Sequence, residues 1–309
     1  MPEPPWSGLE NHGPSRQTLE ASYLTSGITW KADYVLNLSA DEKTADLNGW
    51  VTLDNRSGTG YKNAALQLVA GELGRVRPEA DAVMELKSAV AKRAMAAPAF
   101  AEESFFEYHL YTLERKTTVK DNQTKQISLL SGTGAAINKE YVVNGKNFYY
   151  HNRQSPGTPL KDAVETFVEF KNSKENNLGL PLPKGVLRVY KADSRGGQQL
   201  IGEDQIDHTP KDESVRVKMG NAFDIVAERN QTDYQVISDR VYEMAFNVTI
   251  RNHKDQPIVV IVNEPIGGDW RILQSSVPFE KTAAFAAQFK VPVAKDGETK
   301  LDYRVRVKF

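Results

Sequence analysis

"LDYRVRVKF", residues 301–309, decides the class of fold, because the character of its side chains alternates one residue at a time. One face carries apolar and aromatic side chains and the other carries basic ones, in the order Tyr303, Arg304, Val305, Arg306, Val307, Lys308 and Phe309. Successive side chains of a β-strand point to opposite faces of the sheet. The stretch therefore predicts a strand of an antiparallel sheet that has one buried face and one face in water.

The same alternation recurs towards the N-terminus. In "ITWKADYVLNL", residues 28–38, one parity is shared by Trp30, Ala32, Tyr34, Leu36 and Leu38. Further short strand-like segments follow, separated by turns rich in Gly, Pro, Asn and Asp, and no helices alternate with them. This pattern favours an all-β fold of two antiparallel, immunoglobulin-like β-sandwich units over a parallel α/β sheet.

The expected division of the chain has three parts. A Pro-rich, polar flexible arm covers residues 1–17, the first sandwich unit covers 18–158, and the second covers 159–309. An alanine-rich insertion at 72–104 interrupts the first unit, either as a short helix that Pro98 ends or as a disordered linker. The alternative that strands of the two halves share one sheet stays open.

Composition excludes several classes of function. The 39 basic and 40 acidic residues nearly cancel, so no overall field attracts nucleic acid or an anionic membrane. No run of about 18 apolar residues predicts a transmembrane helix. The absence of cysteine excludes disulfides, thiolate nucleophiles and cysteine-ligated metal centres.

The first catalytic candidate lies in "FFEYHLYTLERKTTVKDNQTKQISLL", residues 105–130. If the first half is one strand, Glu107, His109 and Tyr111 share a face, where a glutamate and a tyrosine could orient a proton-transferring imidazole. The alternative is a sheet face on which His109 and Tyr111 pair with neighbouring strands and Glu107 is solvated. The packing interpretation is favoured, because no nucleophile or metal partner stands at a recognisable spacing.

Other chemistries lack a motif. "GEDQIDHTP" brings Asp204, Asp207 and His208 close together, but a turn held by local backbone bonds explains it better than a cation site. No nucleophile elbow and no phosphate-binding loop is present, and "SGTGAA", residues 131–136, is interpreted as a turn. We therefore predict no catalytic residue, no cofactor and no metal.

Two further patterns concern turns. Asn144-Gly145 between apolar runs predicts a β-hairpin. The run of Phe148, Tyr149, Tyr150, His151 and Arg153 that follows either continues a strand of this hairpin or stacks on bases or sugar rings. Separately, "WVTLDNRSG", "FVEFKNSKE" and "NVTIRNHKD" each end an alternating strand in an asparagine, namely Asn55, Asn172 and Asn252. This recurrence is either a general property of hairpins or a sign of related units.

Several segments together resemble one bacterial family, the domain of unknown function 4139, which is also found in proteins named mucoidy inhibitor A-like. They are "YLTSGITWKADY", "LNGWVTLDNRSGTGYKNAALQLVAG", the 105–130 block, "GEDQIDHTPKDESVRVKMGNAFD", "PIGGDWRILQSS" and "LDYRVRV". The resemblance runs from about residue 20 to the C-terminus, with Trp30, Trp50 and Asp269-Trp270 as specific parts. It implies a mostly β, exported protein and transfers no catalytic residue.

These observations lead to a functional expectation. The chain is expected outside the cytoplasm, in the periplasm or at the cell surface, as a processed form of an exported protein. There it is expected to act as a non-catalytic binding or assembly module for an envelope protein, an envelope polymer or its own kind. The alternative is an envelope hydrolase of peptide or glycan, with its site in a cleft between the two units.

Overall fold

The structure is a computed structural model, and it describes residues 12–14, 16, 18, 20–71, 99–154 and 159–309. Within these ranges the chain forms strands and two short 3-10 turns, η1 (Asn147–Tyr150) and η2 (Lys174–Asn176), which confirms the all-β class. Most of the predicted arm at 1–17 and most of the predicted insertion at 72–104 lie outside the described residues. The last residues of the insertion belong to a strand that begins at Phe100.

Ten strands of the described ranges form the largest sheet. In order of neighbours they are β12 (Gln198–Ile206), β11 (Gly185–Ala192), β1 (Ile28–Leu38), β2 (Thr44–Asn55), β8 (Gln123–Asn144), β16 (Ile258–Pro265), β19 (Ala286–Val293) and β18 (Phe279–Ala283), while β10 (Val164–Lys171) pairs with β8 and with β13 (Ser214–Asn221). The sheet is mixed, because β1 pairs with β11 and β8 pairs with β16 in parallel. The sequence predicted antiparallel pairing throughout, and this is wrong for these two pairs. Alternation shows which face of a strand is buried, but it does not show the direction of the neighbouring strand.

A second sheet of five described strands contains the C-terminal stretch. Its order is β17 (Asp269–Ser275), β20 (Gly297–Lys308), β15 (Val241–Asn252), β14 (Ile225–Ser238) and β9 (Leu160–Asp162). In β20 the side chains of Tyr303, Val305 and Val307 are buried, as their alternation predicts. Two small sheets complete the described chain: β3 (Tyr61–Ala64) with β7 (Thr117–Val119), and β4 (Gln67–Ala70), β6 (Tyr108–Leu113) and β5 (Phe100–Phe105).

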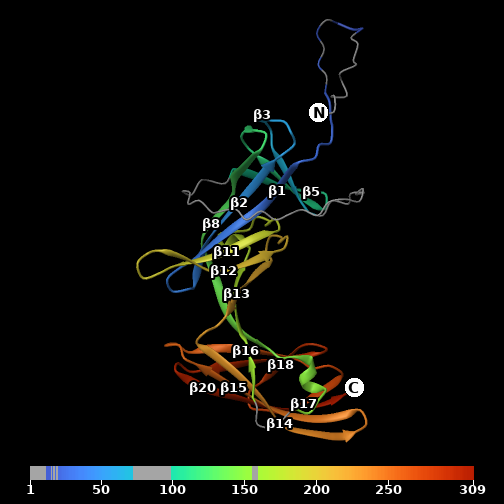
Figure 1. The fold of residues 1–309 in the computed structure, drawn as a ribbon, viewed down its shortest axis with the longest axis vertical. Helices are drawn as coiled ribbons and strands as arrows, with labels where there is room; N and C mark the ends of the chain where they lie inside the picture. The colour runs from blue at the N-terminus through green and yellow to red at the C-terminus, as the bar shows by residue number, and fades with distance from the viewer. Residues whose placement is uncertain (1–11, 15, 17, 19, 72–98, 155–158) are drawn as a thin grey trace.

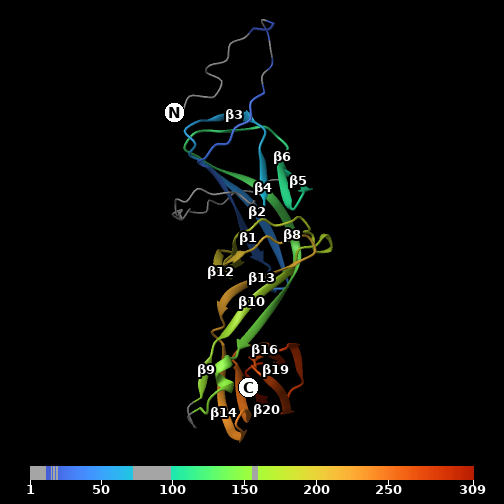
Figure 2. The ribbon, with the colours of Figure 1, turned by 90° about the vertical axis from the view of Figure 1, so that its right-hand side faces the viewer.

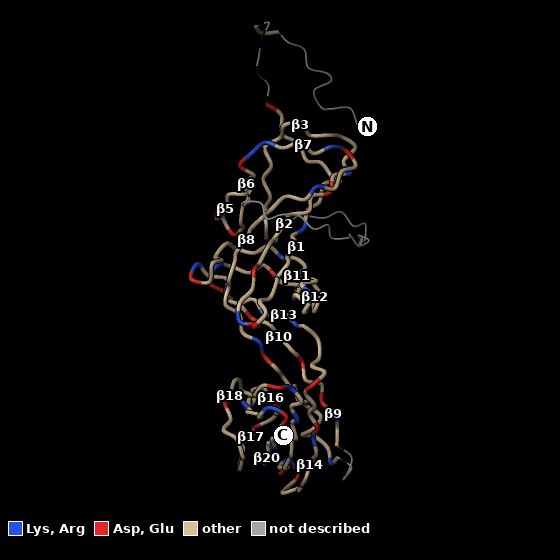
Figure 3. The backbone as a smooth tube through the Cα atoms, turned by 90° about the vertical axis from the view of Figure 1, so that its left-hand side faces the viewer, with Lys and Arg blue, Asp and Glu red and all other residues tan. Residues whose placement is uncertain are grey.

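The molecule is elongated and has two hydrophobic clusters, one in each half (Figures 1 and 2). We call them the upper and the lower cluster, after their places in Figure 1. The upper cluster contains buried residues between Ala32 and Val217, and the lower cluster contains buried residues between Tyr141 and Val307. Residues 168–217 thus pack in the upper cluster, although the predicted unit boundary is at residue 158. Whether 18–158 and 159–309 are separate units stays a prediction. Basic and acidic residues are interspersed along both halves (Figure 3).

Two strands, β8 and β10, contribute residues to both clusters, and β8 is the longer of the two. β8 has 22 residues, which at about 3.3 Å each span roughly 70 Å. Its first part pairs with β2, and from Ile137 onward it pairs with β10 and then with β16. The predicted turn at 131–136 is wrong, because these residues lie inside β8. Gly134, with φ +67°, forms a bulge there, and its N–H donates to Asp46 Oδ1 at 2.8 Å.

The three recurring asparagines are fully buried and make the same kind of bonds. Each side-chain amide donates to a carbonyl of its own turn and to one in the loop that precedes a neighbouring strand, and each Oδ1 accepts a backbone N–H. For Asn55 the partners are Thr59 O (2.9 Å), Lys120 O (2.9 Å) and Ser57 N (3.1 Å); for Asn172, Leu180 O (2.8 Å), Pro210 O (3.0 Å) and Gly179 N (3.0 Å); for Asn252, Gln256 O (2.9 Å), Ala294 O (2.9 Å) and Lys254 N (3.0 Å).

The register around two of these asparagines is also shared. Asn55 lies opposite Ile28 on one side and Gln123 on the other, in the trio β1, β2 and β8. Asn252 lies opposite Ile225 and Gly297, in the trio β14, β15 and β20. The recurrence in the sequence therefore corresponds to a repeated three-strand arrangement, once in each half of the molecule.

Candidate functional site

The predicted row of Glu107, His109 and Tyr111 does not form. Glu107 lies in the turn between β5 and β6, and the carboxylate partner of His109 is Glu102 on β5, with 2.7 Å between Nδ1 and Oε1. The hydroxyl of Tyr111 donates to Pro181 O at 2.8 Å, inside the upper cluster. Sequence reasoning missed Glu102 because it treated 105–113 as one strand, whereas the hairpin turn at Phe106 sets which glutamate faces the imidazole.

The predicted turn around His208 is only partly local, because Asp204 lies in β12 and bonds to the neighbouring strand β13. Asp204 Oδ2 accepts the N–H of Lys218 at 2.8 Å, and the N–H of Lys184 donates to His208 Nδ1 at 3.2 Å. Thr209 donates its hydroxyl to Asp207 O at 2.9 Å. Across the described parts of the chain, no group of three or more His, Cys, Asp or Glu side chains lies close enough to hold a metal ion.

The strongest concentration of buried charge lies in the lower half, around Arg229 on β14. Its side chain is 0% exposed, and so is that of Glu264 on β16. Arg229 Nε donates to Asp162 Oδ2 on β9 at 2.9 Å, and its Nη1 lies 2.6 Å from Glu264 Oε1. Nη1 also donates to the Tyr303 hydroxyl on β20 at 3.2 Å. The guanidinium thereby connects the five-stranded sheet to the large sheet.

Tyrosine hydroxyls complete this buried network. Tyr149 donates to Asp162 Oδ1 at 3.0 Å, and Tyr150 donates to Glu264 Oε2 at 2.6 Å. The Tyr150 hydroxyl is also 2.9 Å from that of Tyr303. Burial, with the nearby negative charge of Asp162, raises the pKa of Tyr149 to about 12. Burial and the charge of Glu264 raise the pKa values of Tyr150 and Tyr303 well above 10, so these hydroxyls remain protonated donors.

The electrostatics of Arg229 favour a permanent cation. Burial alone would lower the pKa of Arg229, but the attraction of Glu264 and its other neighbours outweighs burial and raises it. One guanidinium thus faces two carboxylates in the core, an arrangement that specifies how elements pack. The sequence does contain a signal for it: Arg229 and Glu264 occupy positions of inward parity, in step with buried Ala227 and Val262.

Asn144-Gly145 has a different role from the predicted hairpin turn, which is wrong. β8 ends at Asn144 and the chain continues into η1, which places Tyr149 and Tyr150 in the core rather than at an exposed tip. A Cβ at Gly145 would lie 2.3 Å from Glu264 Oε2, so glycine is required here for close approach to the buried carboxylate.

A hollow of about 540 Å³ lies at this end of β8. Its lining residues are Asn144, Gly145, Asn263, Glu264, Pro265, Thr282, Ala286 and Gln288. Three of the carboxamides form a chain across neighbouring strands: Gln288 Nε2 donates to Asn263 Oδ1 at 3.0 Å, and Asn263 Nδ2 donates to Asn144 Oδ1 at 3.0 Å. Asn144 Nδ2 then donates to Glu165 Oε2 at 2.9 Å. We call the three carboxamides of Asn144, Asn263 and Gln288 the amide row.

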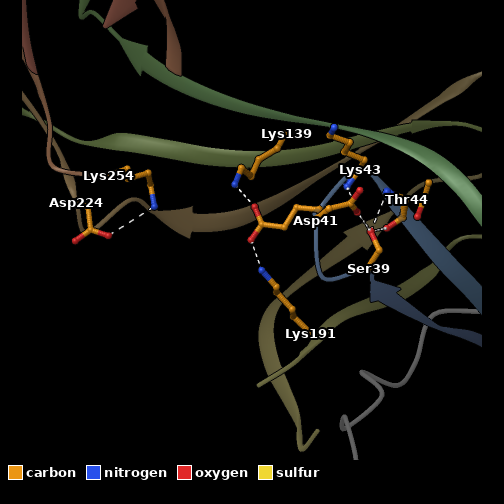
Figure 4. Close-up of polar contacts among 9 residues, drawn as sticks. Ser39, Asp41, Lys43, Thr44, Lys139, Lys191, Asp224 and Lys254 are labelled. Atoms are coloured by element: carbon orange, nitrogen blue, oxygen red, sulfur yellow. Dashed lines mark hydrogen bonds and ion pairs between the residues drawn. The ribbon is translucent and has the colours of Figure 1, made fainter. Parts of the chain in front are cut away.

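A further charged cluster lies where the two halves meet. Figure 4 shows Lys139 of β8 and Lys191 of β11 pointing towards one carboxylate between them, which belongs to Glu42. Lys191 Nζ donates to Glu42 Oε1 at 2.6 Å, and Lys139 Nζ donates to Oε2. Burial alone would raise the pKa of Glu42, but the hydrogen bonds from the two lysines outweigh it and lower the pKa. The cluster ties the turn between β1 and β2 to two other strands.

The comparison with protein families gives a single result of wide coverage. A family described as "Domain of unknown function (DUF4139)" matches residues 19–309, nearly the whole chain. The chain belongs to this family. No curated protein and no solved structure matches it significantly.

The DUF4139 match extends over both hydrophobic clusters and over the buried Arg229 network. The resemblance expected from the sequence is therefore confirmed at the level of the family. In the ranges that the structure describes, no helix of this DUF4139 chain has the length and apolar character needed to cross a membrane.

Proposed function

We propose that this DUF4139 protein is a non-catalytic binding or assembly module of the cell envelope, in the periplasm or at the cell surface. The observation that carries the proposal is the tip of the β5–β6 hairpin. Phe105 is 59% exposed and Phe106 is 83% exposed, side by side at the end of a small sheet. Moving two adjacent phenylalanine side chains from water into a partner's apolar pocket would be favourable, because apolar surface is removed from water.

The hairpin presents this tip on a firm base. Tyr111 and Leu113 of β6, Leu68 of β4 and Phe100 of β5 are buried in the upper cluster. Phe106 has φ +57°, a left-handed conformation that is rare and strained for an aromatic residue. A tip on a packed base favours binding, because less backbone freedom is lost on association.

The alternative, an envelope hydrolase, finds less support in the geometry. The two carboxylates that converge, Asp162 and Glu264, are buried to 3% and 0% exposure and share the guanidinium of Arg229. A glycosidase pair must protonate a substrate and activate a water, which requires access from solvent. The buried position of these carboxylates favours a structural role over hydrolysis.

The extracytoplasmic part of the proposal is supported by the family resemblance, whose members usually carry an export signal. Neutral net charge and a β-rich chain without cysteine suit an envelope module. Binding through a hairpin tip on a β-scaffold is a common mode, because loops carry recognition while sheets hold them in place.

The proposal is tested by capture from an envelope extract. The full chain is compared with Phe105→Ser/Phe106→Ser and with a control, Phe223→Ser, which removes a 97% exposed phenylalanine at another place in the fold. We expect the double variant to lose at least about tenfold in captured material at an unchanged Tm, since both rings contact water in the free protein. Equal capture by the double variant and the wild type would refute the role of the tip.

A further inference from the structure

The hollow beside Glu264 lies in the lower half, whereas the Phe105–Phe106 tip belongs to the upper half. Its volume of about 540 Å³ falls in the range of pockets for small ligands, roughly 300–1,000 Å³. Pro265 and Ala286 supply apolar surface, and the amide row with Thr282 supplies polar groups. The hollow therefore combines the two kinds of surface that a polar organic ligand needs.

The amide row has a defined direction. Its last member, Asn144, donates to the carboxylate of Glu165, which only accepts hydrogen bonds; Lys218 also donates to that carboxylate. Asn263 must then donate to Asn144, and Gln288 must donate to Asn263. Each NH₂ group uses one N–H in this chain and keeps a second, so the row offers donors in fixed positions.

The charge of the lining limits the class of ligand. None of the described residues that line the hollow is Lys, Arg or His, so a phosphate or carboxylate group would find no cation there. Glu264, the one ionisable group of the lining, is already bonded to Arg229 and Tyr150. The neighbouring turn also carries Phe285, which is 60% exposed and adjoins Ala286 in the chain.

We propose that this hollow binds a neutral saccharide, with the amide row donating hydrogen bonds to its hydroxyl or acetamido oxygens. The hydroxyls of a sugar ring both accept and donate hydrogen bonds, so they can pair with the remaining N–H groups and the oxygens of the amide row. Thr282 on the edge strand β18 supplies a hydroxyl that both donates and accepts. Gly145 of the lining leaves no room for a side chain, because its Cβ would meet the buried carboxylate of Glu264.

The test is titration of the full chain against a panel of neutral and acidic oligosaccharides, with binding followed by saturation-transfer NMR and calorimetry. The variants are Asn263→Leu, which removes the middle amide of the row at similar volume, and Thr282→Val. The control is Asn247→Leu, which removes a carboxamide bonded to Asp302 on the five-stranded sheet, away from the lining. Circular dichroism and Tm confirm that each variant is folded.

We expect a neutral oligosaccharide to bind the wild type and the control with equal affinity. Its affinity for Asn263→Leu should be lower by a factor of about ten or more, because the variant lacks hydrogen bonds that a polar site requires. Thr282→Val should weaken binding in the same direction. Binding of acidic members alone, no binding of any neutral member, or unchanged affinity of Asn263→Leu would overturn the proposal. The capture experiment on the hairpin tip is independent, so either result can fail without the other.

Discussion

Arg229 shows what a single buried charge does in this chain. Moving a guanidinium out of water costs several kcal/mol, and the bonds to Asp162, Glu264 and Tyr303 offset that cost. The inward parity of Arg229 and Glu264 was visible in the sequence, but their partners were not, because the pairing joins strands from two sheets. Glu102 escaped prediction for a related reason: the register of a hairpin, and not its composition, decides which side chain faces His109.

Arg229→Met should destabilise the lower half strongly. The variant leaves Asp162 and Glu264 buried without their cation, for which we expect a loss of about 3–5 kcal/mol in the free energy of unfolding. Urea denaturation followed by circular dichroism measures it. The control Arg251→Met removes a partly exposed pair with Glu228 and should change the free energy of unfolding far less. A loss for Arg229→Met no larger than that of the control would contradict the structural role of the network.

The buried tyrosines predict alkaline instability. The pKa of Tyr149 is raised from 10.0 to about 12, so the folded chain holds this proton more tightly than the unfolded chain does. Its contribution to stability is complete below pH 10 and is lost as the pH rises from 10 to about 12. Tyrosinate absorbance should show an early group of exposed tyrosines and a late group that appears together with unfolding. A single early phase for all 12 tyrosines in a folded chain would exclude the network.

At the scale of elements, alternation predicted the strands well and their ends poorly. β20 and β1 lie where period-two patterns placed them, because one face of each is buried. The sequence around Gly134 and around Gly145 predicts a turn that does not form. The first is a bulge within β8, and the second makes room for Glu264. A glycine needed for a bulge or for close approach has the same sequence signal as one needed for a turn.

Asn252→Ala tests the bonds that end the strands. The variant leaves Gln256 O and Ala294 O without their donor at a fully buried position. We expect a loss of about 2–4 kcal/mol, the sum expected for several bonds at a buried site. Differential scanning calorimetry reads it as a lower Tm. Asn247→Ala, at a partly exposed position of the same strand, serves as the control and should change Tm little; equal effects of the two variants would contradict the account.

Glu42→Gln tests the tie between the β1–β2 turn and its neighbours. The pKa of Glu42 is lowered below its ordinary 4.5, so its ion pairs contribute stability above pH 4.5, and that stability is lost as the pH falls through the lowered pKa. Wild type should therefore have the higher Tm at pH 7, and the difference should shrink in acid. A difference that is independent of pH would show that the lysine pairs do not stabilise the turn.

At the scale of the whole molecule, the two clusters share the strands β8 and β10. Sequence patterns placed the strands on buried faces but could not assign them to clusters, because β10, β11 and β13 reach the upper cluster through pairings distant in sequence. β8 enters both clusters, through Ile127 in the upper and Val143 in the lower. We therefore expect the aromatic hairpin tip and the hollow to keep a fixed separation along the length of the molecule.

Hydrogen–deuterium exchange along β8 tests this central claim most directly. Between the clusters, Ile137–Val143 pair with β10, and the last of these residues also pair with β16. The account predicts that amides 137–143 of the intact chain exchange as slowly as amides 126–130, in the middle of the upper cluster. Fast exchange at 135–140, with slow exchange retained on both sides, would reveal a hinge and would contradict it.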